Sequence, residues 1–118
     1  MRLPPVVYVA GPYRGPSAWV VEQNIRAAEA LALEAWKLGW AAICPHANSR
    51  FFSGAAPDDV WLLGDLAILT KCDAVLMVPG WQHSEGARQE RTVARSLKIP
   101  VVETLADLAA ISVSPRPR

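Results

Sequence analysis

The segment that decides the fold class is VVYVA, residues Val6–Ala10, which is followed by a Gly-Pro pair. It is a short apolar run, rich in β-branched side chains and free of charge. This pattern is typical of a strand that is buried on both faces of a parallel sheet. Similar runs at 40–44, 73–78 and 99–102 are expected to form the other strands of the same sheet.

The segments between these strands have helical patterns. Helices are expected at 18–38, where a glycine follows, and at 57–71, which opens with proline and two aspartates. A third helix is opened by Ser84, and a short one spans 104–110. Strands that alternate with such helices predict an α/β fold. We expect a single small flavodoxin-like (Rossmann-like) domain, with a four- to five-stranded parallel sheet and helices on both faces.

Length and composition bound the number of domains and the class of ligand. The 118 residues, 52% of them apolar, fit one domain with one core. We assign residues 1–111 to this domain and expect 112–118, which are rich in proline and polar side chains, to be a disordered tail. Twelve basic and eleven acidic residues give a net charge of +1. No basic field is present to attract DNA or RNA, so a nucleic acid polymer is not expected as a partner.

The cysteines indicate a reduced cytoplasmic protein, and the histidines indicate no metal site. Cys44 and Cys72 are too few for a disulfide framework and too far apart for a metal-binding pair. His46 and His83 match no standard zinc spacing with Cys44. No apolar run approaches the roughly 18 residues of a membrane span. We therefore expect a soluble cytoplasmic protein with no metal, no cofactor and no membrane partner.

Two carboxylates interrupt apolar helical patterns. Glu90 lies on a stripe, at three- and four-residue spacing, whose other members are Gly86, Ala87, Val93, Ala94 and Leu97. Asp65 is the single charge within 61–69. A carboxylate is costly to bury unpaired, so each either reaches water, meets a cation or lines a cavity that uses it. The apolar stripe favours the cavity for Glu90 over an ion pair with an arginine of its own helix; Asp65 could also cap a helix or meet a cation.

Three unusual loops, 11–15, 45–53 and 79–86, each begin where a predicted strand ends. The carboxyl ends of parallel strands share one edge of the sheet, and such folds bind their ligands at that edge. The three loops should therefore form one pocket.

Residue spacing within this pocket suggests glycosyl chemistry. Gly86 lies four residues before Glu90 on one helical face and leaves open volume over its carboxylate. Ser84, with the free amides of the first helical turn, is a natural seat for a phosphate, to which Arg14 could add a donor. Tyr8 could donate a hydrogen bond to Glu90. Two carboxylates beside an anion seat resemble the nucleophile and the acid–base group of retaining glycosidases.

Three motifs carry a resemblance to a known family. They are YVAGP at Tyr8–Pro12 with Arg14-Gly15 behind it, GDL at Gly64–Leu66 with CDAV at Cys72–Val75, and S-x-G-x-x-x-E from Ser84 to Glu90. In this order and spacing the chain resembles, over nearly its whole length, the nucleoside 2-deoxyribosyltransferase superfamily. That superfamily includes the nucleoside monophosphate N-glycosidases and short uncharacterised bacterial and phage relatives.

The resemblance implies catalytic roles for three residues. Glu90 matches the nucleophile that attacks the anomeric carbon and forms a glycosyl-enzyme. Asp65 matches the acidic residue that contacts sugar hydroxyls and assists proton transfer. Tyr8 matches the tyrosine that hydrogen-bonds the nucleophile. The implied reaction is cleavage or transfer of an N-glycosidic bond.

The resemblance also implies substrate contacts. Arg14, Gly15 and Ser84 match positions that hold a 5′-phosphate, whereas transferases acting on free nucleosides carry an aspartate where this chain has Ser84. The implied small-molecule partner is a nucleoside 5′-monophosphate rather than a nucleoside. Further substrate-binding residues are expected to be Gly11, Gly86, His46 beside base or sugar, and Trp81 stacking on the base. Relatives of this fold often complete the pocket from a neighbour, so a homodimer or higher oligomer is expected.

Two other functions stay open at this point. The bulky segment 81–83 and Arg88 depart from the family pattern, which would suit a nucleotide or nucleotide-sugar sensor without efficient catalysis. A structural subunit whose aromatic loops dock a partner is the third possibility.

Overall fold

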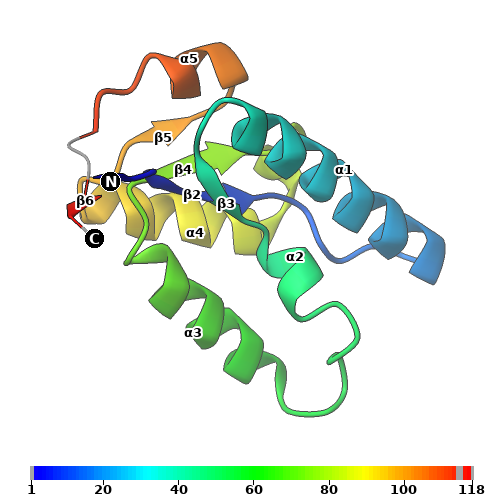
Figure 1. Ribbon diagram of the computed structural model, residues 1–118. Helices are drawn as coiled ribbons and strands as arrows, with labels where there is room; N and C mark the ends of the chain where they lie inside the picture. Colours follow the sequence, from blue (N-terminus) through cyan, green and yellow to red (C-terminus); the bar gives the residue numbers. More distant parts are fainter. Residues whose placement is uncertain (1, 114–115, 118) are drawn as a thin grey trace.

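The computed structural model describes residues 2–113 and 116–117 and has an α/β fold built on a parallel sheet (Figure 1). This sheet has the strand order β3-β2-β4-β5, and each neighbouring pair is parallel. The order is that of the first four strands of a flavodoxin-like sheet, so the expected fold class is confirmed. The strands are β2 (Val6–Ala10), β3 (Ala41–Ile43), β4 (Ala74–Met77) and β5 (Val101–Val102).

Helices cover both faces of the sheet, as Figure 1 shows. One face carries α1 (Ala18–Lys37) and α5 (Leu105–Ala109), and the other carries α3 (Asp58–Leu69) and α4 (Glu85–Ser96). No helix in the described part of the chain is both long enough and apolar enough to cross a membrane.

The central strand β2 explains the two-sided core. Val7 and Val9 pack in the clusters that contain α1, whereas Tyr8 and Ala10 pack in the cluster that contains α3 and α4. Successive side chains of a strand point to opposite faces, so a strand covered on both sides needs apolar residues at every position. All four of these side chains are fully buried, as the apolar run predicts.

Capping residues fix the helix ends. Ser84 and Thr104 each accept a hydrogen bond from the amide three residues further on, at 3.2 and 3.0 Å. The helix starts expected at these residues are therefore confirmed. The first helix ends before Gly39, whose φ of 93° lies in the left-handed region that favours glycine.

The loops contain more regular structure than the sequence suggested. The segment that follows β3 begins with a one-turn helix, α2 (Pro45–Asn48), because proline at the first helical position has a suitable φ. A 3₁₀ turn, η1 (Trp81–His83), precedes α4. The last strand, β5, is also shorter than the expected 99–102.

The expected disordered tail differs from the structure where it is described. Arg116–Pro117 forms β6, which pairs antiparallel with β1 (Arg2–Leu3). Val113 packs against the core cluster that contains Leu108. Backbone pairing does not depend on apolar side chains, so a polar composition did not reveal this strand. Residues 114, 115 and 118 of the predicted tail lie outside the described residues.

Gly11 is expected to be required by close packing. A β-carbon at Gly11 would lie 2.5 Å from the Cβ of Val78, which follows β4. The substitution Gly11→Ala should therefore lower the free energy of unfolding by about 1–3 kcal/mol, measured by urea denaturation. Gly64→Ala is the matched control. A β-carbon at Gly64, inside α3, would meet nothing within 4 Å, so this change should raise stability by roughly 0.5–1 kcal/mol. Equal effects of the two substitutions would contradict this account.

Candidate active site

A cavity of about 1170 Å³ opens at the carboxyl ends of the strands. The segments that follow β2 and β3 line it, together with the first turns of α4 and one face of α3. The structure therefore brings the three expected loops together at one edge. The lining includes eight of the residues expected from the sequence: Gly11, Arg14, Gly15, His46, Asp65, Ser84, Gly86 and Glu90.

Glu90 and Tyr8 form a buried pair at this cavity. Glu90 lies in the second turn of α4 and is only 7% exposed, and Tyr8, in the middle of β2, is fully buried. The Tyr8 hydroxyl donates a hydrogen bond to Oε2 of Glu90. Burial and the neighbouring carboxylate raise the pKa of Tyr8, so its hydroxyl keeps its proton and remains a donor.

Burial also controls the ionisation of Glu90. Desolvation raises the pKa of Glu90 to about 7; the Tyr8 hydrogen bond lowers it and the charge of Asp65 raises it. Glu90 forms no ion pair with any residue in the ranges 2–113 and 116–117. The interpretation of Glu90 as a simple helical ion pair is therefore not supported.

Asp65 supplies a second carboxylate from α3. It is half-buried, lines the cavity, and has a pKa raised to about 6 by desolvation. The residues described here also offer it no ion pair. Two carboxyl groups on facing helices thus titrate near neutrality in one cavity. Such a pair can exchange protons with a bound molecule at physiological pH.

Ser84 and Arg14 provide candidate anion contacts. The Ser84 Oγ accepts from the Ala87 amide as the helix cap, which leaves its hydroxyl proton able to donate to a ligand. The first-turn amides of α4 add further donors and the positive end of the helix dipole. Arg14 is exposed and pairs with Asp58 at 2.6 Å. An exposed pair of this kind contributes little, so Arg14 remains able to exchange its partner.

Glycine has a different role at Gly15 than at Gly86. A β-carbon at Gly15 would lie 2.3 Å from Cγ1 of Val20, so this glycine allows the loop to pack against α1. A β-carbon at Gly86 would meet nothing within 4 Å. Gly86 thus contributes open space to the cavity, as the sequence suggested.

His46 is held as part of the cavity wall. It lies on α2, and its Nε2 is 2.9 Å from the carbonyl oxygen of Gly11, to which it donates in the neutral tautomer that carries the proton there. Burial lowers the pKa of His46, so the imidazole is neutral at physiological pH. The rings of Tyr13 and His46 form a T-shaped contact, with their centroids 5.2 Å apart.

Trp81 does not lie at the cavity, in contrast to the sequence expectation. Its Nε1 donates to Glu103 at 2.9 Å, and the Arg91 guanidinium stacks over its ring at 4.7 Å. Gly80, with φ of 93°, leads into η1, and the indole that follows lies beside Glu103, just after β5. Arg88 is also outside the lining and donates to the Gln82 carbonyl oxygen at 2.7 Å.

Several lining residues were not singled out from the sequence as site residues. Trp61 lies four residues before Asp65, and its buried Nε1 is the one such side-chain atom without a hydrogen-bond partner among the described residues. Arg50 lines the cavity as well and pairs with Glu22 and Glu29. In the sequence, only the four-residue spacing from Asp65 indicated that Trp61 could lie at the site. No feature of the sequence indicated that Arg50 would line the cavity. The described residues contain no group of three or more His, Cys, Asp or Glu arranged to hold a metal ion.

Comparison with known proteins places the chain in a family. Residues 5–103 match the model of a domain of unknown function, DUF4406. The chain belongs to this family. The match begins just before β2 and ends just after β5, so the DUF4406 domain contains the whole parallel sheet and all eight expected residues that line the cavity. No curated protein matches the chain.

The pKa of Glu90 in this DUF4406 domain predicts a pH-dependent stability. Because folding raises this pKa from 4.5 to about 7, the folded state binds the extra proton and stability falls as pH rises through that window. Glu90→Gln keeps an acceptor for Tyr8 but cannot ionise. Between pH 5 and 8 the wild type should therefore lose roughly 2–3 kcal/mol more unfolding free energy than Glu90→Gln. Urea denaturation at each pH measures this difference, with the exposed Glu85→Gln as control. If the unfolding free energy changes with pH to the same extent in the wild type and in Glu90→Gln, the pKa of Glu90 is not raised by folding.

Proposed function

We propose that the protein is an enzyme that cleaves or transfers the N-glycosidic bond of a small nucleotide, a nucleoside 5′-monophosphate, as the resemblance to the nucleoside 2-deoxyribosyltransferase superfamily implies. The proposal rests on the buried Tyr8–Glu90 pair, which lies beside Asp65. The cavity at this pair also contains candidate contacts for an anion, Ser84 and Arg14. Such a site fits a substrate that has a phosphate at one end and a reactive anomeric carbon at the other.

In the first step Glu90 is the nucleophile. Tyr8 holds Oε2, so Oε1 attacks the anomeric carbon from the space that Gly86 leaves open. The bond from the anomeric carbon to the base breaks, and its electron pair leaves with the base nitrogen. The base takes a proton from Asp65, whose pKa desolvation raises to about 6, so that a fraction of this carboxyl group carries a proton near neutral pH.

In the second step the glycosyl ester is resolved. Water, or the nitrogen of an acceptor base, attacks the anomeric carbon and the bond to Glu90 breaks. The carboxylate of Glu90 is restored, and the proton of the attacking group goes to Asp65. With water the products are the free base and a sugar 5-phosphate.

The phosphate of the substrate would occupy the N-terminus of α4. The Ser84 hydroxyl, the first-turn amides and Arg14 are donors of suitable kind, and the helix dipole favours an anion there. Arg14 would exchange its exposed contact with Asp58 for the phosphate. The partner-free Nε1 of Trp61 would donate to the base or sugar. A cytoplasmic setting, in which nucleotides are found, agrees with the free thiol of Cys44.

The alternative is a nucleotide sensor with the same cavity and no turnover. Its motivation in the sequence was the bulky segment 81–83 and the charge of Arg88. Trp81 and Arg88 lie outside the lining of the cavity and do not obstruct the reaction proposed here, whereas His83 of the same segment lines it. The two carboxyl groups that the reaction needs line the cavity as well. We therefore favour the enzyme.

The proposed mechanism predicts loss of base release when the carboxylates are changed. Incubation with a panel of nucleoside 5′-monophosphates, followed by chromatography, should detect free base from the wild type. Glu90→Ala should reduce kcat by about 10³-fold or more, and Asp65→Asn by roughly 10²-fold. Tyr8→Phe, which loses only the orienting hydrogen bond, should have a smaller effect, and Glu34→Gln on the far side of α1 none.

The same assay distinguishes the alternatives. An added acceptor base gives a new nucleotide if the enzyme is a transferase and leaves hydrolysis unchanged if it is not. Base release that persists undiminished in Glu90→Ala would contradict the mechanism. Nucleotide binding by calorimetry with no turnover would favour the sensor.

We further propose that the chain forms a homo-oligomer through α3. Leu63 and Val60 on this helix are 65% and 50% exposed, and burying such side chains would stabilise an interface. Light scattering should therefore give a dimer or higher oligomer. Leu63→Glu should shift it to monomer, whereas Leu33→Glu at an exposed apolar position on α1 should not. A monomeric wild type at working concentration would reject the interface.

A further inference from the structure

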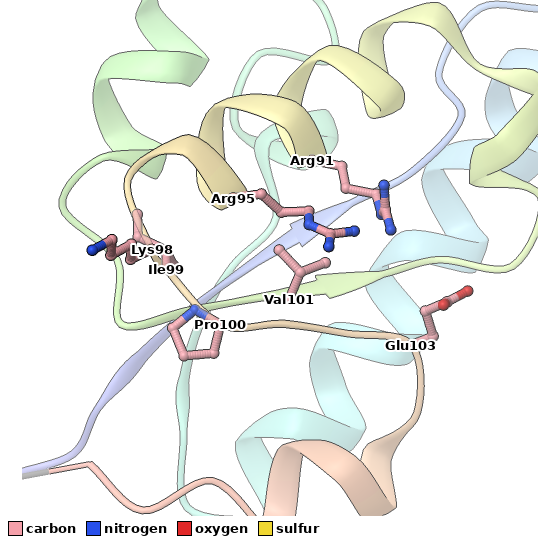
Figure 2. A pocket seen from close by; sticks show the side chains of 7 residues that line it. All are labelled: Arg91, Arg95, Lys98, Ile99, Pro100, Val101 and Glu103. Atoms are coloured by element: carbon pink, nitrogen blue, oxygen red, sulfur yellow. The ribbon is translucent and has the colours of Figure 1, made fainter.

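A second hollow lies along α4, and no residue lines both this groove and the cavity. The groove has a volume of about 390 Å³ and lies between α4 and β5 (Figure 2). Its lining consists of Arg91, Arg95, Lys98, the segment 99–101 and Glu103. None of these residues has a part in the proposed glycosyl chemistry.

The groove carries three cations without an ion-pair partner among the described residues. Arg91, Arg95 and Lys98 form no ion pair with any other described residue. Glu103 instead accepts from Trp81, and Arg91 is held over the ring of that same tryptophan. Figure 2 shows the guanidinium groups of Arg91 and Arg95 extending in the same direction beside Val101.

Lys98 occupies a position that usually belongs to glycine. It follows α4 in a Schellman-type ending, in which the Ile99 amide donates to the Ala94 carbonyl oxygen at 2.9 Å. Its φ of 60° lies in the left-handed region, which is unfavourable for a residue with a side chain. A cation thus stands at the end of the groove despite backbone strain, which points to a use for its charge.

The other wall of the groove is an open edge of the sheet. Among the described strands β5 pairs with β4 alone. The Pro100 carbonyl oxygen accepts from the Val75 amide at 2.9 Å, and because ladder contacts alternate along a strand, the amide and carbonyl of Val101 face outward. An open edge of this kind can accept an extended peptide as an added strand.

The spacing of the cations matches such a strand. Arg91 and Arg95 are one helical turn apart, about 6 Å along the axis. Side chains on one face of an extended chain recur every second residue, about 6.6 Å apart. We propose that this groove binds an extended acidic segment of a partner protein, with Asp or Glu at alternate positions, which adds to β5 as a fifth strand.

A second copy of this chain does not fit the groove. Pairing β5 with β5 of another copy would bring two sets of the three cations together, and like charges opposed across an interface are destabilising. The same charges that disfavour self-pairing therefore select an acidic partner.

The test uses short labelled peptides and fluorescence anisotropy on the full chain. A peptide in which Glu and Thr alternate should bind at low salt and be released as salt rises. An isomer of the same composition, built from Glu-Glu-Thr-Thr repeats, places adjacent acids on opposite faces and should bind roughly fivefold more weakly. Equal binding of the two isomers would show non-specific charge attraction and overturn the proposal.

Protein variants test whether the peptide binds at the groove or elsewhere on the surface. Arg95→Glu should weaken binding roughly tenfold, whereas Lys37→Glu on α1 should leave it unchanged. Lys98→Gly removes a charge and relieves the left-handed strain, so it should weaken binding while keeping or raising the melting temperature. Wild-type affinity in both Arg95→Glu and Lys98→Gly would overturn the proposal.

Backbone methylation tests the added strand itself. Two versions of the alternating peptide carry N-methyl groups, one on the Glu amides and one on the Thr amides. Only one set of amides faces β5, so one version should lose binding and the other should keep it. If both N-methylated versions lose affinity to the same extent, the peptide does not add as a strand. Binding of free citrate without binding of either peptide isomer would also contradict strand addition.

Discussion

The hydrogen bond from Tyr8 to Glu90 is the interaction on which the candidate site depends. It joins the central strand of the sheet to the helix that borders the cavity. A carboxyl group that is only 7% exposed would be strongly disfavoured as an anion without such a donor, because burial removes its hydration. The single hydroxyl offsets only part of that cost, so the pKa of Glu90 remains near neutrality. The protein thus keeps a carboxyl group in a place where folding alone would favour an apolar side chain.

The helix α4 connects this site to the rest of the surface. Its N-terminal turn and one face line the cavity with Ser84, Gly86 and Glu90, while Arg91 and Arg95 lie on the face beside β5. Trp81 lies on the face of α4 that carries the groove, where it contacts both Arg91 and Glu103. The helix α4 can line both the cavity and the groove because it lies near the edge of the sheet. The described residues contain no further strand beyond β5.

Much of the fold followed from local patterns. The uncharged apolar run at Val6–Ala10 specified a strand covered on both faces, and the caps at Ser84 and Thr104 specified where helices begin. These features depend on neighbours in the sequence, so they can be recognised there. The strand β6 and the turn η1 were missed because the first uses backbone pairing with a distant segment and the second follows a left-handed glycine. The position of Trp81 was wrong for the same reason, since one turn decides to which side of α4 the indole points.

The sequence by itself determined the fold class, the two misplaced carboxylates and the edge of the sheet at which the loops meet, because periodicity and strand ends are local properties of the chain. The tertiary structure decided which side chains share a cavity and how they ionise. The pKa of Glu90 lies near neutrality because burial desolvates its carboxyl group and the charge of Asp65 on α3 adds to the shift, against the hydrogen bond from Tyr8. The partner-free Trp61 indole and the open edge of β5 likewise exist only after folding, since desolvation and missing partners are properties of packed elements rather than of residue order.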